Sequence, residues 1–256
     1  MRPFPLSLTL TAGLVALSLT ATLAADEHWP APVQALVDQG LEVHGEFAAP
    51  GGLSGYAASH RGREMAVYLT PDGEHALVGT LLDADGNDLS AAPLDEHVRS
   101  GQEAEVWQQL EESHWIQDGD SEAERVIYTF TDPNCPYCAR FHDQSRPWVE
   151  DGEVQLRHIM VGILRSDSPA KAAALLGAED PAAALQAHQD SDEGIEGSAQ
   201  PREIEEQVYA NNQLFEMLGL MATPTSYYRN DEGRLEKVEG APSEERLEDM
   251  MGSPGP

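Results

Sequence analysis

The two cysteines of the 256-residue chain, Cys135 and Cys138, stand three positions apart, between a segment with strand character and one with helical character. Residues 126–130 are β-branched and aromatic and predict a strand, and residues 131–134 predict a turn. Residues 135–149 then predict a helix that begins at the first cysteine. A Cys-x-x-Cys pair that opens a helix directly after a strand is typical of a thioredoxin-like domain.

This placement favours thiol–disulfide chemistry. The thiolate is the reactive form of cysteine, and the N-terminus of a helix stabilises negative charge, so Cys135 is the predicted attacking thiolate. Cys138 lies one turn further along, close enough to attack a mixed disulfide on Cys135 and release the substrate. Pro136 suits the first helical turn, where no intrahelical N–H is required.

Two other roles of the pair are weaker predictions. A structural disulfide between residues three positions apart would close a very short loop and would stabilise the fold little. A zinc site could include His142, four residues after Cys138, but zinc needs four ligands and the sequence has no second Cys-x-x-Cys. We therefore expect neither a metal site nor a cofactor.

The N-terminus predicts export. Arg2 precedes an apolar run over residues 6–23 that carries no charge, and Thr22 and Ala24 provide the small-x-small pattern of a cleavage site. A membrane anchor is the alternative, because the run is nearly long enough to span a bilayer. The serine and threonine content and the cleavage pattern favour a cleavable signal peptide over residues 1–24. We expect the mature chain in the periplasm, an oxidising compartment.

The charge balance limits the class of partner. The chain has 45 acidic residues against 15 basic ones, a formal net charge of −30. Nucleic acid is excluded as a partner, because phosphate binding needs clustered lysine and arginine. Acidic groups near Cys135 are also expected to raise its pKa and to oppose the helix dipole.

The segment before the cysteines divides into two parts. Residues 26–92 contain two predicted strands, Met65–Thr70 and Ala76–Leu82, each followed by a turn rich in Pro, Asp or Gly, which favours a small antiparallel sheet. About 65 residues make a marginal core, so this unit is expected to need a partner surface. Residues 94–116 predict an amphipathic helix, the main part of a linker over residues 93–121.

Residues 122–252 predict the domain that carries the cysteines. After the first strand and helix, the sequence predicts a strand over 154–161, helical residues 169–189 and 203–218, a strand hairpin over 225–238 and a terminal helix over 243–251. This order of strands and helices fits a mixed α/β fold.

Several segments together resemble the DsbC/DsbG family of periplasmic disulfide isomerases. Phe130–Phe141 carries the cysteines, Thr223-Pro224 precedes the hairpin, and the Pro-Tyr dipeptide between the cysteines is closest to the DsbG members. Further similarity to the same proteins lies in Val161–Ala174, Tyr68–His75 and Trp107–Asp118.

The resemblance implies a thioredoxin-like catalytic domain with inserted helices, of α/β or α+β type, preceded by a small cystatin-like α+β dimerisation domain and a linker helix. It implies a V-shaped homodimer, a DsbD-type membrane reductant that keeps the cysteines reduced, and unfolded or oxidised periplasmic client proteins. It assigns attack to Cys135 and resolution to Cys138. It implies a substrate-binding surface made of Pro136, Tyr137, Thr223 and Pro224, with the Thr223–Pro224 bond cis. The DsbG members also suggest reduction of sulfenic acids on client cysteines.

The sequence thus predicts a thiol–disulfide oxidoreductase that acts as isomerase or reductase, and two alternatives stay open. A DsbA-like oxidase would run the same pair in the opposite direction, although an oxidase needs neither a dimerisation domain nor a linker. A dimeric chaperone would hold unfolded clients in its cleft, with the redox activity secondary. The chain departs from the family pattern at Asn134 and His142. His142 is interpreted as a helix-surface residue, with a proton relay as the alternative because it is close to Cys138.

Overall fold

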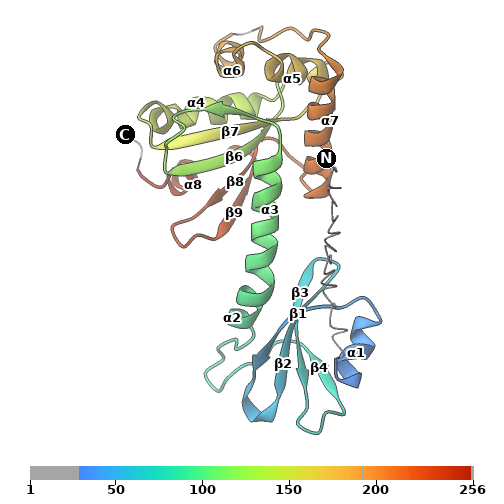
Figure 1. Cartoon of the computed structure of the whole chain (residues 1–256). Helices are drawn as coiled ribbons and strands as arrows, with labels where there is room; N and C mark the ends of the chain where they lie inside the picture. Colours follow the sequence, from blue (N-terminus) through green and yellow to red (C-terminus); the bar gives the residue numbers. More distant parts are fainter. Residues whose placement is uncertain (1–28, 192, 255–256) are drawn as a thin grey trace, which may run out of the picture.

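The computed structural model describes residues 29–191 and 193–254 as two lobes joined by a helix (Figure 1). The N-terminal lobe is a four-stranded sheet with one short helix, and the C-terminal lobe is a five-stranded sheet with helices on both faces. The signal peptide predicted over residues 1–24 lies outside the described residues. Within the described part of the chain, no helix combines the length and apolarity that crossing a membrane requires.

The N-terminal sheet is fully antiparallel in the order β1-β2-β3-β4. Its elements are α1 (Ala31–Val37), β1 (Glu42–Ala48), the 3₁₀ turn Pro50–Gly52, β2 (Ser54–His60), β3 (Arg63–Leu69) and β4 (Ala76–Val78). Side chains alternate between the two faces of a strand, and both faces of β2 are buried. Tyr56 and Ala58 pack with Val33 of α1, while Ala57 faces the opposite side with Tyr68 of β3. The sheet is therefore covered on both faces.

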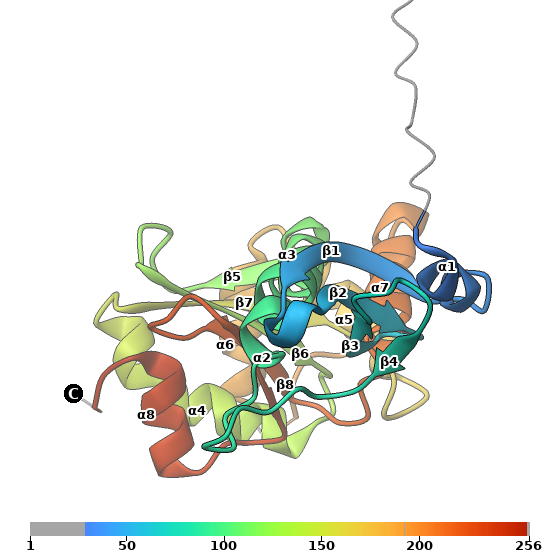
Figure 2. The ribbon, with the colours of Figure 1, turned by 90° about the horizontal axis from the view of Figure 1, so that it is seen from below.

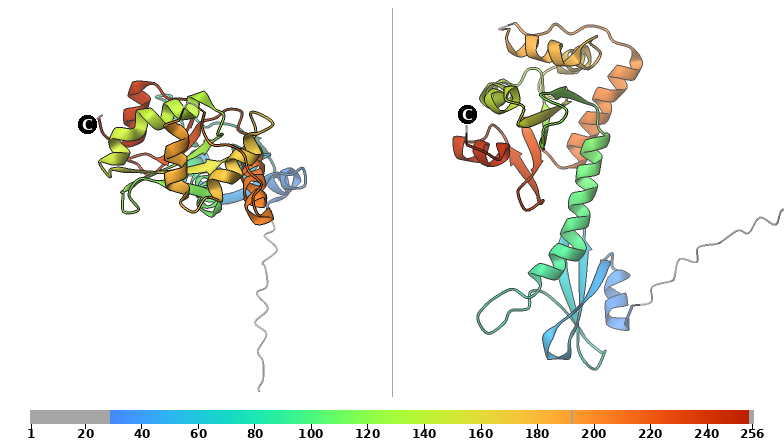
Figure 3. Two further views of the ribbon diagram at one scale, coloured as in Figure 1. Left: turned by 90° about the horizontal axis from the view of Figure 1, so that it is seen from above. Right: turned by 60° about the vertical axis from the view of Figure 1, so that its left-hand side comes forward.

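The linker is a continuous helical segment whose two ends are buried in different lobes. It comprises α2 (Ala91–Leu94), a π-helical turn (Asp95–Arg99) and α3 (Ser100–Glu112). Leu94 and Val98 pack with Ala57 and Tyr68 of the N-terminal sheet. Leu110, at the other end, is fully buried in the core of the C-terminal lobe. Figure 3 (right) shows α3 standing between the two lobes.

The linker helix is shorter than its sequence predicted. The helix expected over residues 94–116 ends at Glu112, and Trp115–Asp118 forms β5. Ser113 is extended, and the side chain of Asn211 accepts the N–H of His114 at 3.1 Å and donates to its carbonyl at 2.7 Å. These contacts turn the chain, so that β5 pairs with β7. A tertiary pairing thus overrides the helical pattern at this point.

The C-terminal sheet has the order β5-β7-β6-β8-β9. Its strands and helices after β5 are β6 (Arg125–Thr131), α4 (Pro136–Glu150), β7 (Val154–Met160), α5 (Ser168–Leu176), α6 (Pro181–Gln189), α7 (Arg202–Met217), β8 (Thr225–Arg229), β9 (Leu235–Glu239) and α8 (Glu244–Met251). β6 and β7 are parallel, and the other neighbouring pairs are antiparallel. The single helical segment predicted over 169–189 is divided into α5 and α6, because Asp180 caps a new helix by accepting the N–H of Ala183.

Two layers of helices cover this sheet. Phe141 and Trp148 of α4 and Leu247 of α8 pack with Ile127 on one face. On the other face, Leu110 of α3 and Phe215 of α7 pack with the β6 aromatics Tyr128 and Phe130. Seen from below, α4 and α8 lie on one side of α3, and α1 and α7 lie on the other (Figure 2).

The strand directions bring three loops to one edge of the sheet. β6 and β7 are parallel, with Thr131 opposite Met160, so both strands end at this edge. β8 is antiparallel to β6, with Phe130 opposite Thr225, so β8 begins at the same edge. The loops after β6, after β7 and before β8 therefore converge on the start of α4.

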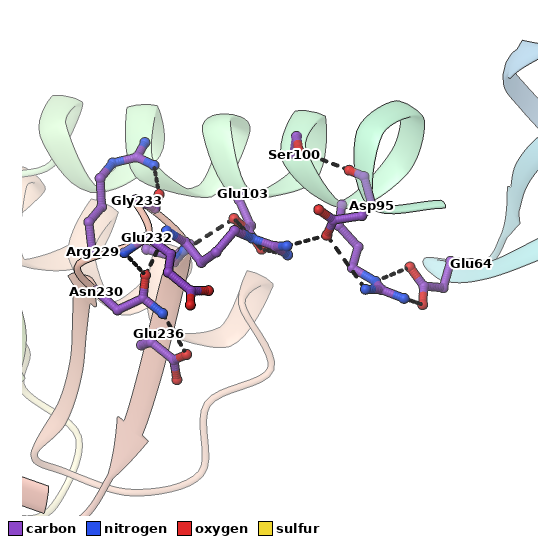
Figure 4. Close-up of polar contacts among 12 residues, drawn as sticks. Glu64, Asp95, Ser100, Glu103, Arg229, Asn230, Glu232, Gly233 and Glu236 are labelled. Carbon is purple, nitrogen blue, oxygen red and sulfur yellow. Dashed lines mark hydrogen bonds and ion pairs between the residues drawn. The ribbon is translucent and has the colours of Figure 1, made fainter. Parts of the chain in front are cut away.

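A series of ion pairs runs along the linker from one lobe to the other (Figure 4). Glu64 of β3 binds Arg99 with both carboxylate oxygens at 2.7 Å. Arg99 also contacts Asp95 at 3.5 Å, and Asp95 pairs with Arg234, which lies in the β8–β9 turn. Arg234 in turn binds Glu103 of α3 at 2.5 Å, and this contact is the main cause that lowers the pKa of Glu103. We call these five residues the linker ion-pair series.

We expect Arg234→Gln to loosen the C-terminal lobe from the linker. The substitution removes both ion pairs of the β8–β9 turn to the linker, while the apolar contacts of Leu110 remain. The free energy of unfolding should fall by about 1 kcal/mol or less, since the pairs are partly exposed. Small-angle scattering should show a broader distribution of lobe separations. Arg202→Gln, which removes an equal charge from an exposed pair on α7, is the control; equal scattering from both variants would contradict the role given to Arg234.

Candidate active site

Cys135 caps the N-terminus of α4. Its backbone is extended, with φ −91° and ψ 109°, and its Sγ accepts the backbone N–H of Cys138 at 3.2 Å. Pro136 occupies the first turn, as predicted. The sulfur therefore sits where the unpaired N–H groups of a helix favour negative charge.

The Thr223–Pro224 peptide lies directly against this sulfur. The bond is cis, which confirms the expectation from the sequence. The Sγ of Cys135 donates to the carbonyl oxygen of Thr223 at 3.2 Å, across 88 positions of sequence. Thr225 holds the same loop by donating its hydroxyl to the carbonyl of Ala222 at 2.7 Å. The fold thus brings together the two segments that the sequence singled out.

The two thiols ionise very differently. Hydrogen bonding from the Cys138 side chain is the largest cause that lowers the pKa of Cys135 to about 6. Burial opposes it, and hydrogen bonds from the backbone N–H groups of Cys138 and Tyr137 add to it. Burial raises the pKa of Cys138 well above its ordinary value, and the hydrogen bond and charge of Cys135 raise it further. The expectation that acidic surroundings raise the pKa of Cys135 is therefore wrong, because direct contacts outweigh distant surface charge. At neutral pH Cys135 is therefore the more readily ionised thiol of the pair.

A buried carboxylate that the sequence analysis did not single out fixes the loop before Cys135. Asp132 is 1% exposed, and it accepts the N–H groups of Asn134, Ile163 and Leu164 at 2.8, 2.8 and 2.9 Å. It also accepts the hydroxyl of Ser168 at 2.8 Å. The β6–α4 loop is thereby attached to the β7–α5 loop. The sequence could have identified Asp132 as a residue that fixes this loop, because it stands three positions before the first cysteine in a predicted turn.

Asn134, which departs from the family pattern, extends this network. Its side-chain amide donates to Asp167 at 3.0 Å and to Ser168 at 2.9 Å, and its oxygen accepts from Lys171 at 3.0 Å. Lys171 lines a cavity of about 320 Å³ that opens beside Cys135. Asn134 therefore supports the wall of the site by contacts to α5.

Exposed apolar side chains lie near Cys135 on three segments: the first turn of α4, the loop after β7 and the loop before β8. Tyr137 is 59% exposed in the first turn of α4, and Met221 is 88% exposed just before the cis peptide. Ile163 and Leu164, 39% and 49% exposed, follow β7. Exposed apolar groups gathered at one place are typical of a surface that binds another chain.

The interpretation of His142 as a helix-surface residue is wrong. Its side chain is 2% exposed and lies on the inner face of α4, near His158 of β7 and Asp118 of β5. The pattern of α4 explains this, because His142 follows the buried Cys138 by four positions and therefore shares its face. Among residues 29–191 and 193–254, no three His, Cys, Asp or Glu side chains form a group that could hold a metal ion.

Comparison with known proteins gives concordant matches. A family model described as a thioredoxin-like domain matches residues 116–253. The chain is similar to the thiol:disulfide interchange protein DsbG of Pseudomonas aeruginosa, with 46% identity over 96% of each chain. It is also similar to the thiol:disulfide interchange protein DsbG of Escherichia coli, with 37% identity over 94% of this chain and 98% of the relative. The catalytic domain of Proteus mirabilis ScsC shares the fold, with a TM-score of 0.50 and 21% identity over 58% of this chain and 94% of that one.

Removing the Asp132 carboxylate should disorder the loop that presents Cys135. Asp132→Ala leaves three N–H groups and a hydroxyl without their acceptor, so we expect the free energy of unfolding to fall by about 2–4 kcal/mol. Asp132→Asn should cost less, because one amide oxygen can still accept. Chemical denaturation of both variants measures the difference, and equal stability of Asp132→Ala and wild type would contradict the role of the carboxylate.

The pKa of Cys135 predicts its reactivity. Because this pKa is lowered to about 6, the thiolate persists until the pH falls below that value. The rate of alkylation by iodoacetamide should rise with a midpoint at about pH 6 and then stay constant, while Cys138 stays unreactive; mass spectrometry distinguishes the two sites. In Cys138→Ala the midpoint should move upward, since the largest cause of the lowering is gone. A wild-type midpoint near the ordinary thiol value of about 8.5 would contradict the assignment.

Proposed function

The chain belongs to the DsbG family of thiol:disulfide interchange proteins, and we propose that it acts in the periplasm as a disulfide isomerase and reductase through Cys135 and Cys138. It is a thiol–disulfide oxidoreductase with a thioredoxin-like fold. The observation that carries the assignment of roles is the unequal ionisation of the two thiols. Cys135 has a pKa of about 6 at a helix N-terminus, whereas Cys138 is buried with a raised pKa.

In the first step the Cys135 thiolate attacks a client disulfide. Its sulfur forms a bond to one client sulfur, and the other client sulfur leaves as a thiolate. In isomerisation, another client thiolate attacks the client sulfur of the mixed disulfide. A new client disulfide forms, and Cys135 is released as a thiolate. In reduction, Cys138 attacks Cys135, so that the client is released as a thiolate and the protein becomes a disulfide. A DsbD-type membrane reductant would then restore both thiols.

The substrate-binding role proposed for Thr223, Pro224, Pro136 and Tyr137 rests on their positions. The carbonyl of Thr223 lies 3.2 Å from the attacking sulfur, so a client cysteine bonded to that sulfur comes close to the Thr223 backbone. Pro136 and Tyr137 are exposed in the first turn of α4, on the side from which a client arrives. The apolar side chains nearby suit an unfolded client, and they also support the chaperone activity held as an alternative.

Sulfenic acid reduction is the second reaction we propose for the same pair. The Cys135 thiolate attacks the sulfur of a client sulfenic acid, and with one proton the hydroxyl leaves as water. The mixed disulfide is then resolved by Cys138, which releases the client thiolate. The net change reduces one client sulfur and oxidises the pair, so the same reductant is required.

We also propose a homodimer formed by the N-terminal lobes, with domains over residues 26–92, 93–121 and 122–252 after a signal peptide over 1–24. Strand β4 supports this assembly, because it is the last strand of its sheet and its Leu77 and Val78 are 54% and 52% exposed. An apolar edge strand favours pairing with a second chain. The clients would be unfolded or oxidised periplasmic proteins.

Single cysteine variants test the roles. Cys138→Ser should accumulate mixed disulfides with clients, because Cys135 attacks and nothing on the protein resolves the product. Cys135→Ser should form none, because the remaining thiol is buried with a raised pKa. Non-reducing gels of alkylated extracts show these adducts, and adducts of Cys135→Ser at wild-type abundance would refute the assignment.

The same extracts decide the direction of exchange. After acid quench and alkylation, two labelled cysteines in the resting wild-type protein support the isomerase and reductase function. A resting disulfide would replace it with the DsbA-like oxidase. Suppression of client aggregation by Cys135→Ser, without exchange, would separate a chaperone activity from the redox chemistry.

A further inference from the structure

The methionine side chains differ sharply in their exposure to solvent. Met160, Met250 and Met251 are buried, with exposed fractions of 0%, 0% and 2%. Met217 and Met221 are 68% and 88% exposed, the two highest values among the large apolar side chains of residues 29–191 and 193–254. Single exposed apolar residues are common on protein surfaces, so the position of each thioether decides what it can do.

Met221 lies in the loop between α7 and β8, two positions before Thr223. Two residues of chain span at most about 7 Å, so the α-carbons of Met221 and Thr223 lie within that distance of each other. The carbonyl of Thr223 contacts the Sγ of Cys135 at 3.2 Å. Met221 therefore stands beside the attacking sulfur, whereas Met217 is the last residue of α7.

The backbone on both sides of Met221 is held by hydrogen bonds. The N–H of Leu220 donates to the carbonyl of Phe215 at 3.1 Å, and the Leu220 side chain is buried with Phe215 in the core. After Met221, the hydroxyl of Thr225 donates to the carbonyl of Ala222 at 2.7 Å. The loop thus presents the Met221 side chain outward from a fixed backbone, and a flexible, polarizable thioether can fit apolar clients of different shapes.

We propose that Met221 is a redox modification site, at which a peroxide converts the thioether to the sulfoxide and thereby slows the capture of apolar clients by Cys135. This inference rests on the proposed function, because it concerns the surface that holds the client during attack. The clients affected are those with apolar residues beside the reacting cysteine. Clients with polar residues there make no use of the thioether and are captured as before.

The oxidation transfers two electrons from the Met221 sulfur to the peroxide. The sulfur forms a bond to one oxygen of hydrogen peroxide, the O–O bond breaks, and the other oxygen leaves as water with both protons. The product is a polar side chain in place of an apolar one. Peroxides also convert thiolates to sulfenic acids, so Met221 meets this oxidant under the conditions that produce sulfenic acids on clients.

The sulfoxide and the cysteine disulfide are reversed by different chemistry. A disulfide between Cys135 and Cys138 is reduced by exchange with a thiol. A methionine sulfoxide is not reversed in this way and needs a methionine sulfoxide reductase. Modified Met221 therefore persists after the cysteine pair has been reduced. The reduced protein then attacks disulfides as before, but with a more polar surface beside Cys135.

Peroxide treatment with the cysteines protected tests the site of modification. The wild type is first converted to the Cys135–Cys138 disulfide and then exposed to hydrogen peroxide, after which dithiothreitol restores the thiols and leaves any sulfoxide in place. Mass spectrometry of peptides should show Met221 oxidised at least about tenfold faster than the fully buried Met250. Equal rates at these two residues would overturn the proposal.

Stopped-flow measurement of peptide capture tests the consequence. Two peptides, Leu-Cys-Leu and Ser-Cys-Ser, carry thiopyridine on their cysteine, and attack by Cys135 releases it. Because the leaving group is shared, the ratio of the two rates reports contacts with the neighbouring residues. Reduced wild type should favour the leucine peptide, and oxidation of Met221 should lower this ratio about fivefold. Methionine sulfoxide reductase should restore it.

Three variants assign the effect to one thioether. Met221→Gln should show the low ratio without peroxide, and Met221→Leu should keep the high ratio with and without peroxide. Met217→Gln is the matched control, because it removes the other exposed thioether and should keep the wild-type ratio. Circular dichroism verifies that each variant is folded.

The possible outcomes are distinct. The proposal is overturned by a ratio that falls equally in Met217→Gln, by a ratio that peroxide lowers in Met221→Leu, or by an unchanged ratio after complete oxidation of Met221. If reduced wild type released thiopyridine from neither peptide, the proposed function itself would fail.

Discussion

The active site depends on strand β6, which is hydrogen-bonded on both sides in fixed register. Its parallel pairing with β7 and antiparallel pairing with β8 place the end of β6, the end of β7 and the start of β8 at one edge. A strand that slips by one residue turns every side chain to the opposite face, so the buried alternation of Ile127, Tyr128 and Phe130 holds the register. The contact between Cys135 and Thr223 follows from this pairing.

Local contacts, rather than net charge, govern the chemistry of the site. The chain carries a formal charge of −30, yet the Cys135 sulfur is stabilised as a thiolate by a thiol, a backbone N–H and a helix N-terminus within bonding distance. Surface carboxylates act through water and salt, which screen them beyond about 8–10 Å. Direct contacts therefore decide the ionisation of Cys135 more than the net charge of the chain does.

Local composition and spacing predicted the strand, turn and helix around Cys135, whereas the cis peptide was predicted from the resemblance to the DsbC/DsbG family. It did not predict the four hydrogen bonds of Asp132, since its partners Ile163, Leu164 and Ser168 lie 31 to 36 positions away. It extended the linker helix over Trp115–Asp118 for a related reason, because pairing with β7 is a long-range contact that periodicity cannot reveal. The burial of His142 could have been predicted, as its spacing from Cys138 places it on the inner face of α4.

Strand β8 has the cis peptide at one end and contacts to the linker at the other. At its start, the Thr223–Pro224 peptide rests against Cys135. At its far end, Arg229 stacks on Trp107 of α3 at 4.8 Å, and the adjoining turn holds Arg234 against Glu103. Five residues of extended chain, about 16 Å, connect the two ends. Strand β8 therefore connects the contacts that hold the C-terminal lobe against α3 with the peptide that lies beside the Cys135 sulfur.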